Sequence, residues 1–234
     1  MGFLKRLFPG KNRTHYLSNE EIDAITGHFA KHVGPVRDMV LHEIVSDALH
    51  IDLHVIPDVP GHDCAVVFTT GMSALPMPRI EPEWQFAELF VVLPKEWVKG
   101  NNLQTDEGYW PLGFMKTMAR MPIYNKIPVY PGISIPNGDP AEEFPGTQFT
   151  GMLLDRGDLF GPDFGRAELG GKTINFYGMM PMLRKEMDWK ANQESPAIYF
   201  AALMQLGVTE RERLLIDVNR PCFFDRIRDN QPNA

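Results

Sequence analysis

Histidines near the start of the chain are the side chains best suited to metal chemistry. All seven histidines fall within residues 1–62. His28 and His32 are four residues apart, which places both imidazoles on one face of a helix. His50, Asp52 and His54 alternate along a predicted strand and therefore share one face of a sheet. Two such pairs with a carboxylate match the ligands of catalytic zinc or iron. The alternative is that the helix pair lies at a solvated edge and the strand residues line a polar sheet face without metal.

Three familiar enzyme motifs are incomplete or absent. Gly165–Thr173 resembles a phosphate-binding loop, but Arg166 stands where its first glycine belongs, and residues 173–177 have the composition of a strand. Adjacent glycines between extended segments predict a hairpin turn instead. His42 begins like a zinc-protease helix, but Ser46 replaces the second histidine. No serine lies in a G-x-S-x-G elbow.

Composition predicts one globular domain and argues against nucleic-acid binding. The chain has 234 residues, of which 44% are hydrophobic, which is enough for a sizeable core. The net charge is −7, without the clustered Lys and Arg that a duplex binder needs. Cys64 and Cys222 are distant in sequence, and we expect both to be free, buried thiols in a reducing compartment.

The first 17 residues form a basic segment without an acidic side chain. Its apolar part is too short for a signal peptide, and no apolar run in the chain approaches the roughly 18 residues of a membrane span. We therefore expect a cytoplasmic location. Peripheral membrane contact through residues 3–13 stays open beside a terminus that packs on the domain or frays.

Sequence patterns predict helices and strands in alternation. Ser18 and Glu21 form a capping box before a helix over residues 19–33. Residues 49–55 alternate as a half-buried strand, whereas the apolar run 86–93 is typical of a strand covered on both faces. Further strands are predicted over residues 64–70, 148–155, 173–180 and 214–218.

The remaining pattern completes an α+β fold. Pro111 marks a helix start, and a third helix opens at Ser195 and ends at Gly207. Residues 122–145 form a proline-rich loop. Together, these predicted helices and strands indicate a single domain over residues 18–225, built on a central twisted mixed sheet with helices packed on it. Segments 1–17 and 226–234 flank that domain.

A series of motifs between Asp52 and residue 138 carries a family resemblance. The series continues through Thr70-Gly71-Met72-Ser73, Pro76-Met77, Glu88, Leu93-Pro94, Trp97, Trp110-Pro111 and Ile135-Pro136-Asn137-Gly138. This order resembles the suppressor-of-fused family over roughly residues 30–222.

The resemblance implies a protein-binding function without catalysis or cofactor. In animal members, the domain joins a second domain, and both clamp an extended peptide of a transcription factor as an added strand. This chain is too short for that second domain. It is similar to short bacterial members, many of which are regarded as immunity proteins. The expected function is therefore a non-enzymatic module that binds another protein, and within that class an immunity protein that neutralises a cognate toxin.

Two other functions stay open from the residues alone. A metal-dependent hydrolase would unite His28, His32, His50 and His54 in one pocket. A structural scaffold would form a stable homo-oligomer through a large apolar interface.

Residues of the family motifs give the candidate binding surface. They are Gly71, Met72, Ser73, Glu88, Trp97, Trp110 and Asn137. Each has a structural alternative, because the glycine suits a left-handed turn and the tryptophans suit the edge of a core.

Overall fold

A computed structural model of the chain describes residues 14–38, 40–43 and 48–226. The segment 3–13, for which membrane contact stayed open, lies outside this part, as do residues 227–234 of the predicted C-terminal tail. Within the described ranges, no helix combines the length and apolar character needed to cross a bilayer.

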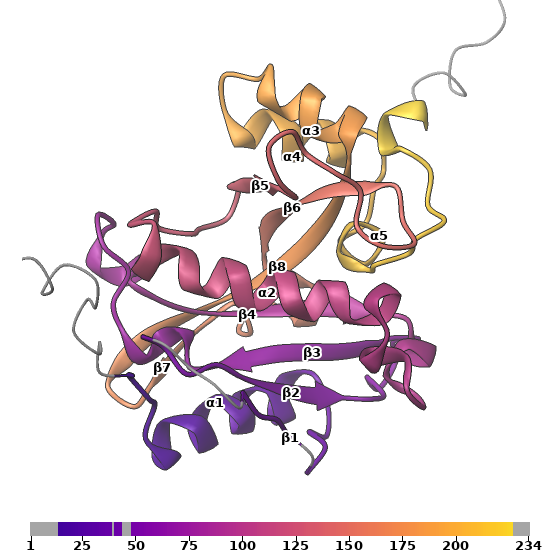
Figure 1. Cartoon of the computed structure of the whole chain (residues 1–234). Helices are drawn as coiled ribbons and strands as arrows, with labels where there is room; N and C mark the ends of the chain where they lie inside the picture. Colours follow the sequence, from indigo (N-terminus) through magenta and orange to yellow (C-terminus); the bar gives the residue numbers. More distant parts are fainter. Residues whose placement is uncertain (1–13, 39, 44–47, 227–234) are drawn as a thin grey trace, which may run out of the picture.

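The described residues form an eight-stranded mixed sheet in the order β1–β2–β3–β4–β8–β6–β5, with β7 also paired to β8. Figure 1 shows β2, β3 and β4 side by side, and the long strand β8 rising from its hairpin with β7 past β4 towards β6. Of these strands, β4 and β8 pair in parallel, and the other pairs are antiparallel. The strands are β1 Val40–Leu41, β2 Asp52–Ile56, β3 Ala65–Thr70, β4 Phe86–Leu93, β5 Ser134–Pro136, β6 Phe149–Arg156, β7 Arg166–Leu169 and β8 Lys172–Leu183.

Helices cover both faces of this sheet. They are α1 Asn19–His32, α2 Asp106–Tyr124, α3 Arg184–Ala191, α4 Pro196–Gln205 and α5 Glu210–Leu214. In Figure 1, α2 lies in front of β4 and β8, and α1 lies beside β2. This arrangement confirms the predicted α+β fold with a central mixed sheet.

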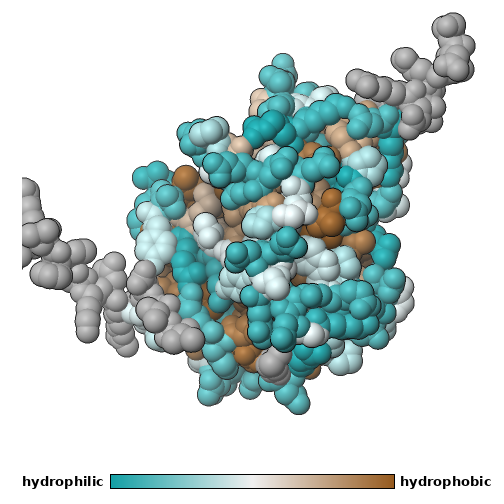
Figure 2. All heavy atoms as spheres, turned by 45° about the vertical axis from the view of Figure 1, so that its right-hand side comes forward, coloured by the Kyte–Doolittle hydropathy of each residue, from teal (hydrophilic) through white to brown (hydrophobic). Residues whose placement is uncertain are grey.

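Two hydrophobic cores result, one on each face. Met115 and Met118 of α2 pack on one face with Val67 and Leu89 of the sheet. On the other face, Phe29 of α1 packs with Phe68 and residues of α4 and α5. Neighbouring residues of β3 thus enter opposite cores, as strand geometry requires. The outer surface seen in Figure 2 is mostly hydrophilic, with hydrophobic residues visible in separate patches.

Strand β8 pairs with three other strands of the sheet. One edge of this 12-residue strand pairs with β4. Its other edge pairs first with β7 and then with β6, so these two strands follow one another along β8. Gly170 and Gly171 join β7 to β8 with φ angles of 58° and 75°, which confirms the predicted hairpin turn.

Several other local predictions are confirmed. Ser18 and Glu21 form the expected capping box of α1. The predicted strands at 64–70, 86–93, 148–155 and 173–180 correspond to β3, β4, β6 and β8. Cys64 and Cys222 are buried and free, and burial raises the pKa of Cys64 to about 11.

The predicted helix start at Pro111 is wrong. Helix α2 begins at Asp106, because the Thr105 side chain accepts a hydrogen bond from the Gly108 N–H at 3.1 Å and caps it. Pro111 lies one turn further on, where its missing N–H leaves the Glu107 carbonyl without a helical donor. The helix start is therefore set by the Thr105 cap and not by Pro111.

The predicted strand at 214–218 is also wrong. Thr209 and Glu212 form a capping box that starts α5 and carries the helix to Leu214. Within this segment, Leu215 pairs with the sheet through an isolated bridge to Val92. The apolar residues therefore reach the core from a helix and the turn after it.

Two further differences concern loops and burial. The predicted loop 122–145 contains the end of α2 and strand β5, and α3 was not predicted. Strand β2 is buried on both faces and is not half-buried. Its polar face is covered because the His54 ring stacks on Phe68, with 5.1 Å between ring centroids.

Candidate functional site

The family-motif turn after β3 is built around the carboxylate of Glu88. This side chain is fully buried on β4 and accepts five hydrogen bonds. The donors are the Thr69 hydroxyl at 2.6 Å, the N–H groups of Gly71, Met72 and Ser73 at 3.0, 3.3 and 3.0 Å, and the Ser73 hydroxyl at 2.6 Å. Burial raises the pKa of Glu88, and these hydrogen bonds oppose the shift.

Gly71 is required by the same turn. Its φ angle is 120°, and an added Cβ would lie 2.0 Å from the carbonyl oxygen of His50. No other residue fits this position without moving the backbone of His50 and Ile51, just before β2. The structure brings Gly71, Met72, Ser73 and Glu88 together, but it buries all four. A buried turn cannot supply the direct contact surface for which these residues were selected.

The other three predicted surface residues lie in different surroundings. Trp110 is buried and stacks on Phe144, with ring centroids 4.2 Å apart. Trp97 is half-buried and meets Trp110 edge-to-face at 6.5 Å. Asn137 is half-buried in the loop after β5, where its side chain donates to the Glu142 carbonyl at 3.2 Å. Only Trp97 and Asn137 of the predicted set keep substantial access to solvent.

The early histidines do not form the predicted four-histidine site. The rings of His28 and His32 lie 4.6 Å apart on α1. However, His28 Nε2 donates to the Phe164 carbonyl at 2.9 Å, and burial lowers the pKa of His28. His54 is buried beside Thr70, and their side chains share a hydrogen bond of 2.9 Å. Burial lowers the pKa of His54 to about 4.

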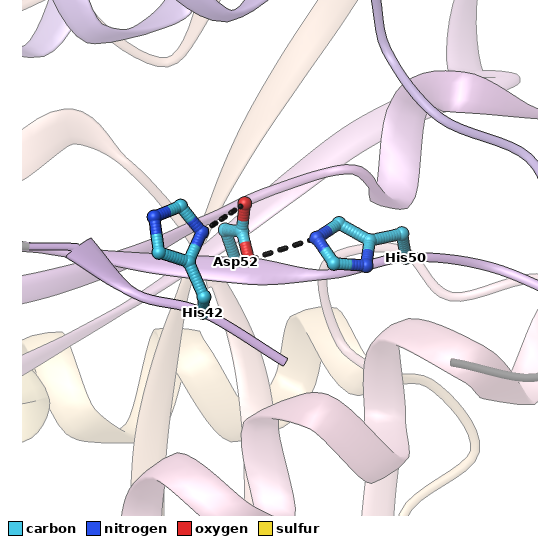
Figure 3. A group of neighbouring side chains, drawn as sticks. All are labelled: His42, His50 and Asp52. Atoms are coloured by element: carbon cyan, nitrogen blue, oxygen red, sulfur yellow. Dashed lines mark hydrogen bonds and ion pairs between the residues drawn. The ribbon is translucent and has the colours of Figure 1, made fainter. Parts of the chain in front are cut away.

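A different histidine group surrounds Asp52. Figure 3 shows the Asp52 carboxylate between two imidazole rings, with His42 Nδ1 at 3.1 Å and His50 Nε2 at 3.0 Å. The Glu43 N–H also donates to this carboxylate, at 3.2 Å. Among the described residues, these three side chains are the one group of His, Cys, Asp or Glu close enough to share a metal ion. In the present geometry, Asp52 joins residues 42–43 to β2 by hydrogen bonds.

The feature that sequence reasoning missed is a cleft at the edge of β8, on the face that α2 covers. A pocket of about 190 Å³ there includes Trp84, Arg156, Arg166 and Tyr177 in its lining. A second pocket of about 310 Å³ shares Trp84 and Arg156, adding Ile80 and Tyr130. We call the two together the β8-edge cleft. Its residues come from separate segments between Ile80 and Tyr177, so no single local motif could reveal it.

Both walls of the β8-edge cleft are tied to the sheet. Asn175 of β8 donates to the carbonyls of Glu83 and Phe86 at 2.9 and 3.0 Å, which fixes the turn that carries Trp84. On the other side, the Gly132 N–H donates to the Leu154 carbonyl of β6 at 2.7 Å and holds the adjacent Tyr130–Pro131 segment. The aromatic walls are therefore pre-organised on a rigid scaffold.

The comparisons with known proteins agree with this fold. The family model for Suppressor of fused protein (SUFU) matches residues 47–221. A search of curated proteins found no match.

Solved structures with the same fold include three from this family. A putative SUFU homologue from Neisseria gonorrhoeae FA 1090 has a TM-score of 0.58 at 13% identity, covering 86% of this chain and 95% of that one. Drosophila Suppressor of Fused has a TM-score of 0.60 at 14% identity, and the match covers 90% of this chain but 52% of the Drosophila chain. A chain of the Sufu–Fu complex has a TM-score of 0.58 at 12% identity, covering 92% of this chain and 95% of that chain.

At these identities, the solved structures support the fold alone, and the chain spans about half the length of the Drosophila protein. The family model is the stronger finding, because it covers well over half of this chain. The resemblance first suggested by the Thr70–Ser73 turn and Glu88 is thereby confirmed: this chain belongs to the Suppressor of fused (SUFU) family.

Proposed function

We propose that this chain is a non-enzymatic protein-binding module whose partner docks in the β8-edge cleft. The observation that carries this proposal is the composition of the cleft, where Trp84, Tyr130, Arg156 and Arg166 gather around pockets. Trp, Tyr and Arg are the residues most enriched at the energetic centres of protein interfaces.

Exposure and rigidity support the same proposal. Tyr130 is 43% exposed although it is a large aromatic side chain. The hydrogen bonds of Asn175 and Gly132 hold the two walls before any partner arrives, which lowers the entropic cost of binding. The existence of a similar structure in a Sufu–Fu complex supports a protein as the partner.

Within this class, the finer proposal is a cytoplasmic immunity protein that neutralises a cognate toxin. Its support is the sequence resemblance to short bacterial members of the family, together with the fold shared with the Neisseria gonorrhoeae homologue, 95% of whose chain is covered. The β8-edge cleft would then hold one segment of the toxin.

Site-specific photo-crosslinking tests the proposal. A photoreactive phenylalanine replaces Tyr130 in the full chain, in the cells that naturally express it, and crosslinked proteins are identified by mass spectrometry. The matched control carries the same group at Tyr109, which is 41% exposed on α2. We expect one protein to crosslink from position 130 and not from position 109.

Different results would contradict the β8-edge cleft as a binding site and the immunity function. Equal crosslinking from both positions, or none from position 130, would overturn the β8-edge cleft as a binding site. The immunity function requires more: the captured protein should arrest growth when expressed alone, and coexpression of this chain should restore it. A captured protein without toxicity would leave a binding module with another role.

One observation favours a second candidate function, metal-dependent hydrolysis. His42, His50 and Asp52 present two imidazoles and a carboxylate within reach of one ion, and this ligand set suits zinc or iron. Elemental analysis of the chain purified without a metal-affinity step tests it. About one metal per chain, lost in Asp52→Asn, would support this alternative, whereas substoichiometric metal in the unmodified chain would remove it.

A further inference from the structure

The smaller pocket of the β8-edge cleft contains charged groups that lack ion-pair partners. Arg156 and Arg166 both line it, and neither guanidinium has such a partner among the described residues. Tyr177 lines the same pocket, is only 2% exposed, and has a hydroxyl without a hydrogen-bond partner in the described part of the chain. A buried hydroxyl left unpaired is energetically costly, so its presence calls for an explanation.

Strand register explains why these groups meet. Arg156 of β6 lies opposite Tyr177 of β8, and Arg166 of β7 lies opposite Asn175. Opposite residues on paired strands share a face of the sheet, and so do residues two apart on one strand. The two arginines therefore flank Tyr177 on a single face, at the point where β7 gives way to β6 along β8.

The charge of this pocket favours an anion. Its lining contains two arginines and one acidic residue, Asp158, which is exposed. Guanidinium groups form paired hydrogen bonds with planar carboxylates, and a phenolic hydroxyl can donate a third. Arg166 is also held near the apolar side of the cleft, because its guanidinium carbon lies 5.7 Å from the centre of the Trp84 ring.

We propose that Arg156, Arg166 and Tyr177 bind an aspartate or glutamate side chain of the partner protein. This proposal rests on the proposed function and adds the chemistry of the partner. The adjoining pocket, lined by Ile80, Trp84 and Tyr130, takes an apolar side chain next to that acidic residue. The recognised segment is thus a short stretch in which a carboxylate and an aliphatic or aromatic side chain are neighbours.

Two matched peptides test this assignment before the partner protein is identified. Acetyl-Gly-Leu-Glu-Gly-amide and acetyl-Gly-Leu-Gln-Gly-amide differ only in their charge, and inorganic phosphate serves as a third probe. Each is titrated to about 10 mM, because a single ion pair and one apolar contact give affinities on the order of 1 mM. Binding is followed by NMR at the Trp84 indole N–H and at the arginine Nε–H groups of the full chain.

We expect the glutamate peptide to shift these signals and the glutamine peptide to leave them nearly unchanged. Arg156→Ala and Arg166→Ala should each weaken binding of the glutamate peptide by roughly tenfold, which is the typical effect of losing a charged hydrogen bond. Both arginines are exposed, so neither variant should disturb folding. The control is Arg37→Ala, an exposed arginine beside β2 whose replacement should have no effect.

Three outcomes would overturn the proposal: equal binding of the two peptides, no shift at about 10 mM glutamate peptide, or the same affinity in Arg166→Ala and Arg37→Ala. Tighter binding of phosphate than of the glutamate peptide would also overturn it, because the pocket would then be a phosphate site. The protein captured by crosslinking separates this proposal from the proposed function. If its binding requires Trp84 but tolerates both arginine variants, the carboxylate assignment fails while the binding module stands.

Discussion

The turn held by Glu88 and the cleft at the edge of β8 both place charged groups against the sheet, yet they differ in how those groups are satisfied. The Glu88 carboxylate is fully buried and accepts five hydrogen bonds from its own chain. In the cleft, Arg156 and Arg166 have no carboxylate partner within the described ranges, and the Tyr177 hydroxyl has no partner at all there.

This difference separates structural roles from binding roles. A buried polar group with all its hydrogen bonds made contributes to one folded conformation and offers nothing to a ligand. A pre-organised group without a partner still has hydrogen bonds to form, and it can form them with another molecule. The family motif around Gly71 therefore contributes to the fold, and the proposed function places the binding residues outside that motif.

Replacing Glu88 should produce the largest change in stability. Glu88→Ala removes the acceptor of five hydrogen bonds in a buried turn, so the free energy of unfolding should fall by at least about 3 kcal/mol. Urea denaturation monitored by tryptophan fluorescence measures this loss. Glu96→Ala is the matched control, because that carboxylate is exposed and its ion pair with Lys99 is worth about 0–1 kcal/mol. Equal denaturation midpoints in the two variants would mean that the turn does not depend on its carboxylate.

Acid should weaken the same region through His54. Its pKa is about 4 in the folded chain, below the ordinary value of 6.5, because burial disfavours the charged ring more than the nearby Asp52 favours it. The unfolded chain therefore binds more protons between these two values, and stability falls as the pH drops from 6.5 towards 4. The loss from this group approaches roughly 3 kcal/mol at the low end.

His54→Gln keeps a hydrogen-bonding side chain beside Thr70 but removes the titrating group. Urea denaturation of both proteins at about pH 7, 6, 5 and 4.5 should show a flatter profile for the variant. If the two profiles run parallel, His54 is not the source of the acid sensitivity.

Local sequence signals located the turn around Gly71 but not its role. Gly71 lies between two β-rich runs and Glu88 stands in a nearly apolar strand, and both were predicted as contact residues, whereas the structure buries them within the fold. The hairpin at Gly170 and Gly171 was equally clear, since adjacent glycines suit the left-handed conformation of that turn. The errors at Pro111 and at 214–218 arose where the helix caps Thr105 and Thr209 lie upstream of the more conspicuous residue.

The β8-edge cleft could not be predicted in this way. Arg156, Arg166 and Tyr177 become neighbours because β6 and β7 pair in succession with one edge of β8. The hydrogen bonds of Asn175 and Gly132 then hold Trp84 and Tyr130 at the same cleft. That register depends on the whole sheet and not on any short segment. The only local hint is weak: Arg156 ends one strand and Arg166 begins the next.

Two half-buried tryptophans allow the proposed division of roles to be tested on binding. Trp84 lines the β8-edge cleft, and Trp97 belongs to the family motif. Trp84→Ala should weaken binding of the crosslinked partner by about 2 kcal/mol, or roughly 30-fold, as expected for a central aromatic contact. Trp97→Ala should leave the affinity unchanged. Calorimetric titration of both variants decides between them, and the opposite ranking would return the binding surface to the motif.

The variants with the smallest expected change in stability give the most direct test, because each removes a single oxygen atom, one from the Glu88 turn and one from the β8-edge cleft. Ser73→Ala deletes a hydroxyl that donates to Glu88 at 2.6 Å, and it should cost about 1–2 kcal/mol of folding free energy. Tyr177→Phe deletes a hydroxyl without a partner among the described residues, so the free energy of unfolding should change by less than about 0.5 kcal/mol or rise slightly. The same Tyr177→Phe variant should nevertheless bind the glutamate peptide several-fold more weakly, as followed by NMR at Trp84. A hydroxyl that contributes to binding but not to folding would distinguish the two regions within a single pair of variants. A large loss of stability in Tyr177→Phe would instead mean that the Tyr177 hydroxyl, like the groups around Glu88, is hydrogen-bonded within the folded chain.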